Sequence, residues 1–354
     1  MNDSVNDGLN HSLNDSLNPS VNPRQHDSAN HHRTVVGWDG GDAAADAVAW
    51  AVERERGRHG TIALVRVVAD HHHSSNYAAV QSAIEAAQLE LTAEATRLGK
   101  LAPECFITTT VVHGDPLDEL IGQANPGWVL AVGAAKRHRS PFGHGSSLAA
   151  QIAAAANGPV AIIPPAIIPP AVNSPATNSP NTGTAGSRRR TGVVVGVDGS
   201  AESLRAVDVA IAEAVRRQEE LILIHAWQEP TALAEEYTID PRLVEAVEEQ
   251  GERILAAATT SIFERYPELR VRAQLVGGAA EIALREAATT AALVVVGTRH
   301  LRGLKRILLG SVSHYVVQHL QCPTIVVGHG SAESGSDGSS SEQSGSEQQS
   351  GGQR

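Results

Sequence analysis

The sequence predicts two tandem α/β domains, each built on a doubly wound, five-stranded parallel sheet of Rossmann-like type. The motif Val-Val-Gly-x-Asp-Gly occurs at residues 35–40 and again at 194–199, which is 159 residues later. A Val-Gly pair ending at Gly133 recurs, in the same order, at Gly297. Solenoid repeats run to only about 20–50 residues, so a period this long indicates a duplicated domain. In both copies short apolar runs alternate with amphipathic stretches, the pattern of buried parallel strands joined by helices.

The predicted elements follow this alternation along each copy. Strands of the second copy are predicted at 192–197, 221–226, 270–276, 293–296 and 324–327. Its helices are predicted at 202–217, 241–266, 279–290 and 311–320. Strands of the first copy are predicted at 34–38, 62–67, 105–112, 128–132 and 160–163, again with helices between them.

Composition sets the domain boundaries. Polar, low-complexity residues at 1–32 and 329–354 predict disordered tails, and the Pro-, Ala-, Asn- and Ser-rich segment 164–190 predicts a linker. The two domains then span 33–163 and 191–328, each long enough for a core of its own.

Charge and cysteine content exclude several classes of protein. The net charge of −11 argues against general binding to nucleic acid or to anionic membranes, which require a basic face. With only two cysteines no disulfide framework is available, as in a reducing compartment. Neither a signal-peptide core nor an apolar run of membrane-spanning length is present. We therefore expect a cytoplasmic protein.

Ligands of doubly wound sheets bind beyond the carboxyl ends of the strands, where the strand order reverses. Asp198 ends the first strand of the second copy and Asp39 that of the first. A carboxylate there could accept hydrogen bonds from a nucleoside. The alternative is that Asp-Gly-Ser only turns the chain and Ser200 caps the next helix.

A stronger pattern starts at the end of the fourth strand of the second copy. Gly297 follows an apolar run directly, which would let the backbone approach a ligand closely. Gly310-Ser311 opens the last helix, whose free amides and positive dipole end favour phosphate. The loop between them carries four cationic side chains suited to a polyphosphate: Arg299, Arg302, Lys305 and Arg306. As the alternative, these are turn glycines and a solvated charged loop.

Together these segments resemble the universal stress protein family. The likeness rests on Val-Gly-Val-Asp-Gly-Ser after the first strand, Leu-Ile-His-Ala at the second, Val-Val-Gly-Thr-Arg through Leu-Leu-Gly-Ser-Val-Ser, and the closing Cys-Pro-Thr-Ile-Val-Val. The resemblance covers 192–327 closely and 33–163 more loosely. It implies a five-stranded α/β fold and ATP, with Mg²⁺ as its companion ion, held by Gly-2X-Gly-9X-Gly-(Ser/Thr). The positions implied to bind it are Asp198, Ala226, Val296, Gly297, Arg299, His300, Gly310, Ser311, Val312 and Ser313.

Both copies depart from the family element. His300 stands at the middle glycine, where its side chain would either crowd the phosphates or donate to one. The first copy departs further, and the positions left for weaker binding there are Asp39, Gly133, Lys136, Ser146 and Ser147. We expect the second copy to bind nucleotide and the first to act mainly as its partner domain. No catalytic residue and no metal site of the protein's own is predicted, and His71-His72-His73 is interpreted as a solvent loop.

The leading hypothesis is a nucleotide-binding module that senses energy or stress state with little or no turnover. One alternative is an adenylyl- or phosphoryl-transfer enzyme of the related adenine-nucleotide class, with residues 228–240 as its second substrate pocket. The other is a scaffold with vestigial sites. Because the last strands pair edge to edge in this family, we also expect 160–163 and 324–327 to lie together, within one chain or across a homodimer.

Overall fold

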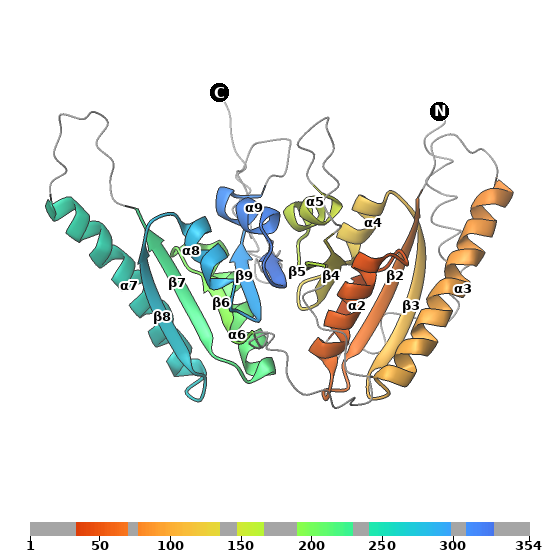
Figure 1. Cartoon of the computed structure of the whole chain (residues 1–354), viewed down its shortest axis with the longest axis horizontal. Coiled ribbons are helices and arrows are strands. Elements are labelled where there is room, and N and C mark those ends of the chain that lie inside the picture. The colour runs from red at the N-terminus through yellow and green to blue at the C-terminus, as the bar shows by residue number, and fades with distance from the viewer. Residues whose placement is uncertain are drawn as a thin grey trace, which may run out of the picture.

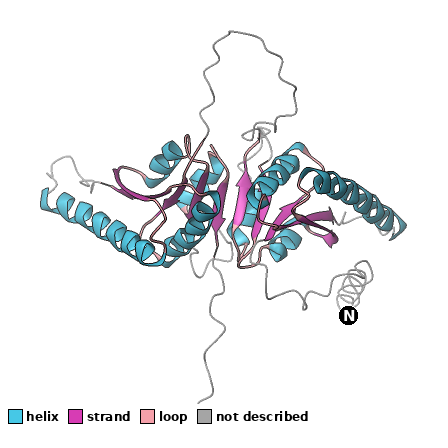
Figure 2. Cartoon of the chain, turned by 90° about the horizontal axis from the view of Figure 1, so that it is seen from below, coloured by secondary structure: helices cyan, strands magenta, loops and turns pink. Residues whose placement is uncertain are grey.

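The computed structural model describes residues 33–69, 77–134, 147–165, 190–228, 241–298 and 309–328. These residues form one ten-stranded sheet with helices on both faces (Figures 1 and 2). The predicted tails, most of the linker and the histidine run at 71–73 lie outside the described residues. Their predicted disorder and the domain boundaries therefore stay predictions.

Each half contributes five strands and four helices to the described part of the chain. The first half contains β1 (Arg33–Gly37), α2 (Asp42–Glu55), β2 (Thr61–Ala69), α3 (Tyr77–Leu101), β3 (Phe106–Gly114), α4 (Pro116–Gln123), β4 (Val129–Gly133), α5 (Leu148–Ala155) and β5 (Val160–Ile163). The second half contains β6 (Val193–Gly196), α6 (Ala201–Arg217), β7 (Leu221–Trp227), α7 (Pro241–Arg265), β8 (Val271–Gly277), α8 (Ala280–Ala287), β9 (Leu293–Gly297), α9 (Ser311–Gln318) and β10 (Thr324–Val327).

The predicted elements agree with these bounds to within a few residues, and the α/β class is confirmed. The largest differences are at strand and helix ends. For α8, residues 279–290 were predicted helical, but the helix ends at Ala287. There the hydroxyls of Thr289 and Thr290 donate to the carbonyls of Glu286 and Ala287, which closes the helix with a turn.

The strand order is β3-β2-β1-β4-β5-β10-β9-β6-β7-β8. Within each half all strand pairs are parallel, while β5 and β10 pair antiparallel, with Ala161 opposite Ile325. The expected pairing of the last strands is confirmed, and it occurs within one chain. The two five-stranded sheets thus become one, and neither β5 nor β10 is an edge strand.

Alternate residues of the strands feed two apolar cores, one on each face of the sheet. Val36 and Val195 belong to the core beneath α2, α3, α6 and α7. Val35 and Val194 belong to the opposite core, beneath α4, α5, α8 and α9. Both cores run through both halves, because the sheet continues across the β5–β10 seam. Figure 1 shows α5 and α9 side by side above this seam.

Candidate functional site

In the second half the strand order reverses between β6 and β9, and a pocket of about 250 Å³ lies at the carboxyl ends of these strands. Predicted site residues from four separate segments meet around it: Asp198, Ala226, Val296, Gly297, Gly310, Ser311, Val312 and Ser313. Every predicted position of this half within the described residues therefore lines one cavity. Arg299 and His300 lie outside the described residues, so their predicted roles stay predictions.

Asp198 stands at the turn between β6 and α6. Gly199 has a left-handed φ of +79°, which permits the tight turn. The Asp198 Oδ1 atom accepts hydrogen bonds from the Ser200 amide at 2.9 Å and the Ser200 hydroxyl at 2.5 Å. Ser200 Oγ also caps α6 by accepting from the Ser203 amide at 3.2 Å. Asp198 thus shapes the turn, and its exposed carboxylate still lines the pocket.

Gly297 has a packing role in addition to the role that the sequence suggests. A β-carbon at this position would lie 2.6 Å from the Glu202 carbonyl oxygen and 2.8 Å from the Glu202 carbonyl carbon. The glycine therefore lets the start of α6 pack against the end of β9. Gly133 repeats the arrangement in the first half, where a β-carbon would lie 2.0 Å from the Ala43 carbonyl oxygen. Helix packing is thus a reason for this glycine that the sequence did not indicate, and its predicted role in close ligand approach stays a prediction.

The start of α9 forms the side of the pocket suited to an anion. Its N-cap, Gly310, has no side chain and makes no side-chain cap hydrogen bond. The backbone amides of the first helical turn have no intrahelical acceptors, and the helix dipole is positive at this end. Ser313 is buried and its hydroxyl donates to the Gly310 carbonyl at 3.1 Å, so this proton is directed to the backbone. Backbone amides and the exposed Ser311 are therefore the donors available to a ligand.

Another part of the pocket wall is apolar. Ile224 and Ala226 of β7 and Leu284 of α8 line it, and the small Ala226 leaves room beside the strand end. The neighbouring residue His225 fixes this strand end from the other face. Its Nδ1 lies 2.7 Å from the Val197 carbonyl oxygen, and because a carbonyl only accepts, Nδ1 carries the proton. Apolar side chains of this kind can pack against an aromatic base.

Sequence reasoning missed several residues that line the same pocket: Gly196, Val197, Ser200, Glu202, Ser203, Ile224, Ala280 and Leu284. Five of them lie between the end of β6 and the start of α6, where only their nearness to Asp198 in the sequence could have indicated them. Glu202 adds a second carboxylate, which Arg205 approaches to 3.4 Å. This ion pair reduces the repulsion that Glu202 would exert on a bound phosphate.

The first half presents a different set of groups at the equivalent place. Ser147 is the N-cap of α5 and its hydroxyl accepts from the Ala150 amide at 3.3 Å, so this helix start is already capped. Asp39 accepts from the Gly41 amide at 2.8 Å and is exposed. By strand register Val67 takes the place of Ala226, which adds bulk to the wall. Lys136 and Ser146 lie outside the described residues.

In the described part of the chain, none of the helices combines the length and apolar character needed to cross a bilayer. Over the same residues, no three His, Cys, Asp or Glu side chains come together as a metal-binding group.

The fold and the pocket define a tandem α/β protein with a crevice at the switch point of its second half. Comparison with known proteins gives the family. The universal stress protein family model matches residues 30–164 and 190–328. Because these matches cover most of the chain, the protein belongs to the universal stress protein family.

The chain is also similar to individual proteins of known sequence or structure. Universal stress protein Rv1996 of Mycobacterium tuberculosis is 29% identical over 317 residues, covering 82% of this chain and 93% of that protein. A universal stress protein from Archaeoglobus fulgidus matches in fold with a TM-score of 0.58 at 16% identity, covering 84% of this chain and 98% of its own. A family member from Arabidopsis thaliana, solved with AMP bound, covers 42% of this chain and 97% of its own at 21% identity and a TM-score of 0.28.

Proposed function

We propose that the second half binds an adenine nucleotide, ATP in the first instance, and that the protein is a cytoplasmic stress or energy sensor with little or no turnover. The observation that carries this proposal is the uncapped start of α9 opening into the same pocket as Asp198 and Ala226. An apolar wall for a base, a carboxylate for ribose hydroxyls and a positive helix end for phosphate occur in one cavity.

The division of labour between the halves is part of the proposal. In α5 the Ser147 hydroxyl occupies the amide that a phosphate would need, while Val67 narrows the wall where Ala226 leaves space. The first half is therefore proposed as a partner domain with weak or no nucleotide binding. Arg299 and His300 are proposed to complete the phosphate site of the second half, and Mg²⁺ to enter with the nucleotide.

Calorimetric titration with adenosine, AMP and ATP tests the site part by part. If phosphate is held at α9, affinity should rise from adenosine to ATP. Gly310→Asp should remove this rise and lower ATP affinity at least tenfold, since it places a carboxylate against the phosphates. Aspartate is also a good N-cap, so the variant should be at least as stable as the wild type, which separates lost binding from unfolding.

Ser147→Asp is the matched control, because it places the same side chain at the equivalent helix start of the first half. It should leave ATP binding unchanged. Equal losses in the two variants would contradict the division of labour. Equal affinity of the wild type for adenosine and ATP would contradict phosphate binding at α9, and no binding at all would favour the scaffold alternative. Stoichiometric transfer of phosphate or adenylate to a small molecule would favour the enzyme alternative.

A further inference from the structure

The two halves meet around an approximate twofold axis, and residues at equivalent sequence positions face each other there. Ala161 and Ile325, which correspond by the 164-residue spacing of Gly133 and Gly297, are register partners across the β5–β10 seam. On the α2 and α6 face of the sheet, Arg54 meets Glu213, and these correspond by the 159-residue spacing of the first repeat. The two copies therefore carry side chains of opposite charge at the same position of the repeat, and these two side chains face each other across the axis.

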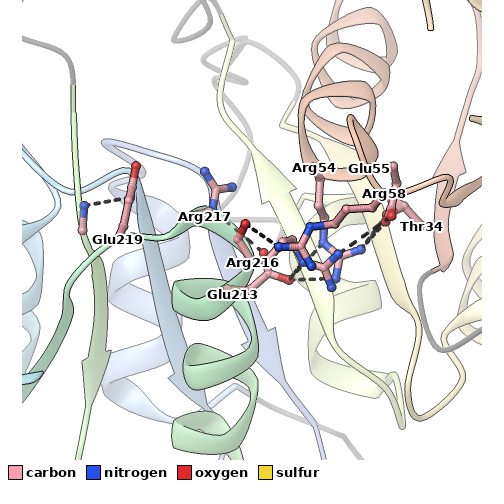
Figure 3. A network of polar contacts seen from close by, with 9 residues as sticks. Thr34, Arg54, Glu55, Arg58, Glu213, Arg216, Arg217 and Glu219 are labelled. Atoms are coloured by element: carbon pink, nitrogen blue, oxygen red, sulfur yellow. Dashed lines mark hydrogen bonds and ion pairs between the residues drawn. The ribbon is translucent and has the colours of Figure 1, made fainter. Parts of the chain in front are cut away.

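This pair is the centre of a buried network between α2 and α6 (Figure 3). Arg54 donates to Glu213 Oε1 through Nε at 3.0 Å and Nη2 at 2.7 Å. Its Nη1 donates to Glu55 Oε1 at 2.5 Å and to Thr34 Oγ1 at 2.7 Å, within its own half. The side chains of Arg54 and Glu213 are 5% and 1% exposed, so the pair is screened from water.

A second ion pair also joins the two halves across the axis, and its residues are not repeated at the equivalent positions. Glu55 of the first half receives Arg216 of the second, with Nη1 3.8 Å from Oε2. By the same spacing, the positions related by the axis are Ala214 and Gly57. One side of the axis thus has an ion pair, and the equivalent positions on the other side are two small residues without charge.

The charges in the network determine which protonation state is buried. Burial alone would raise the pKa of Glu213, but Arg54, Arg216 and Arg217 outweigh it and hold that pKa below its usual value. Burial, together with the neighbouring Arg54, lowers the pKa of Arg216. The carboxylate of Glu213 is therefore ionised at neutral pH, and its match to Arg54 is a match of full charges.

Pairing of two first halves, or of two second halves, would lose both the Arg54–Glu213 and the Glu55–Arg216 ion pair. Two first halves would bury Arg54 against Arg54 and place each Glu55 opposite Gly57. Two second halves would bury Glu213 against Glu213 and place each Arg216 opposite Ala214. In such a pair Arg54 keeps Glu55, and Glu213 keeps Arg216 and Arg217 of its own helix. The two-bond contact between Arg54 and Glu213 is nevertheless replaced by a contact of like charges, which is costly away from water. Backbone pairing between short apolar strands, by contrast, hardly distinguishes β5 from β10.

We infer that this face, formed by the last strand and the first helix of each half, is an interaction surface that accepts the other half and rejects a copy of itself. Its partner is a complementary half carrying the opposite charge at the axis, supplied here by the same chain. The Arg54–Glu213 pair determines that choice, while the strands supply the general affinity.

Mixing of charge-reversed full-length chains tests the inference. Arg54→Glu alone and Glu213→Arg alone each place like charges at the axis, so each should lose stability. In a mixture or co-expression of the two, the first half of either chain finds an opposite charge in the second half of the other. We expect a 1:1 dimer of twice the 37.1 kDa chain mass by light scattering, formed in the mixture only. If one variant fails to fold alone, a soluble dimer on co-expression supports the inference equally.

The control is the exposed ion pair between Asp208 and Arg265, at 2.9 Å within the second half. Mixing Asp208→Arg with Arg265→Glu should leave both chains monomeric. A mixture of the axis variants that stays monomeric, or that aggregates as each variant does alone, overturns the inference. So does dimer formation by either axis variant alone to the extent seen in the mixture.

A double-mutant cycle gives a second readout without like charges. Arg54→Met, Glu213→Gln and the double variant should show a coupling of at least tenfold in the unfolding equilibrium constant, about 1.4 kcal/mol. If the effects of the two substitutions on the free energy of unfolding are additive, the Arg54–Glu213 pair does not determine which half is accepted.

Discussion

Gly297→Ala distinguishes a glycine needed for helix packing from one needed for a ligand. The new β-carbon would lie 2.6 Å from the Glu202 carbonyl oxygen, where ordinary contact begins at 3.4 Å. The β-carbon therefore needs about 0.8 Å more space. This space requires α6 to move away from β9, because the obstructing atoms of Glu202 belong to the backbone. Overpacking of this kind costs about 1–3 kcal/mol. We therefore expect the free energy of unfolding, measured by urea denaturation of the protein without ligand, to fall by about that amount.

Gly277→Ala is the matched control, since a β-carbon there would meet only the Trp227 ring, at 3.9 Å. It should be neutral or stabilise by about 0.4–1 kcal/mol, because alanine restricts the unfolded chain. Gly133→Ala, with its 2.0 Å approach to Ala43, should be at least as destabilising as Gly297→Ala. If Gly297→Ala leaves stability unchanged and lowers only ATP affinity, the packing explanation is wrong and the ligand explanation holds.

Two further predictions concern buried ionisable groups. Because the pKa of Glu213 in the folded protein lies below its ordinary 4.5, the folded state binds fewer protons than the unfolded chain at acid pH. The contribution of Glu213 to the free energy of unfolding should be fully present above about pH 4.5 and decline below it. In urea titrations at different pH, Glu213→Gln should make this decline less steep. An equally steep decline in the variant would contradict the prediction. Burial raises the pKa of Cys322 to about 12. Its thiol should therefore resist iodoacetamide at pH 8 until urea unfolds the protein, as mass spectrometry of its peptide would show; rapid alkylation of the folded protein would refute this.

The sequence located most of the candidate site because the relevant residues stand at strand ends. Asp198, Gly297 and Gly310 each adjoin a recognisable strand or helix boundary, and the carboxyl ends of parallel strands meet at one edge. Glu202 and Leu284 were missed because nothing local distinguishes them from ordinary helix residues. The packing role of Gly297 was also missed, since the 2.6 Å approach of Glu202 arises only when α6 packs on the sheet.

The sequence alone determined the duplication, the strand and helix alternation and the asymmetry between the two helix starts. These follow from local chemistry: repeated motifs, apolar periodicity, and a Gly-Ser helix start at 310–311 that the first half lacks. Only the tertiary structure decided that β5 and β10 join two sheets within one chain, and that Arg54 and Glu213 meet there. On their own helices both look like ordinary solvent-facing charges. Their burial depends on a neighbour 159 residues away, and a contact that distant leaves no local pattern in the sequence.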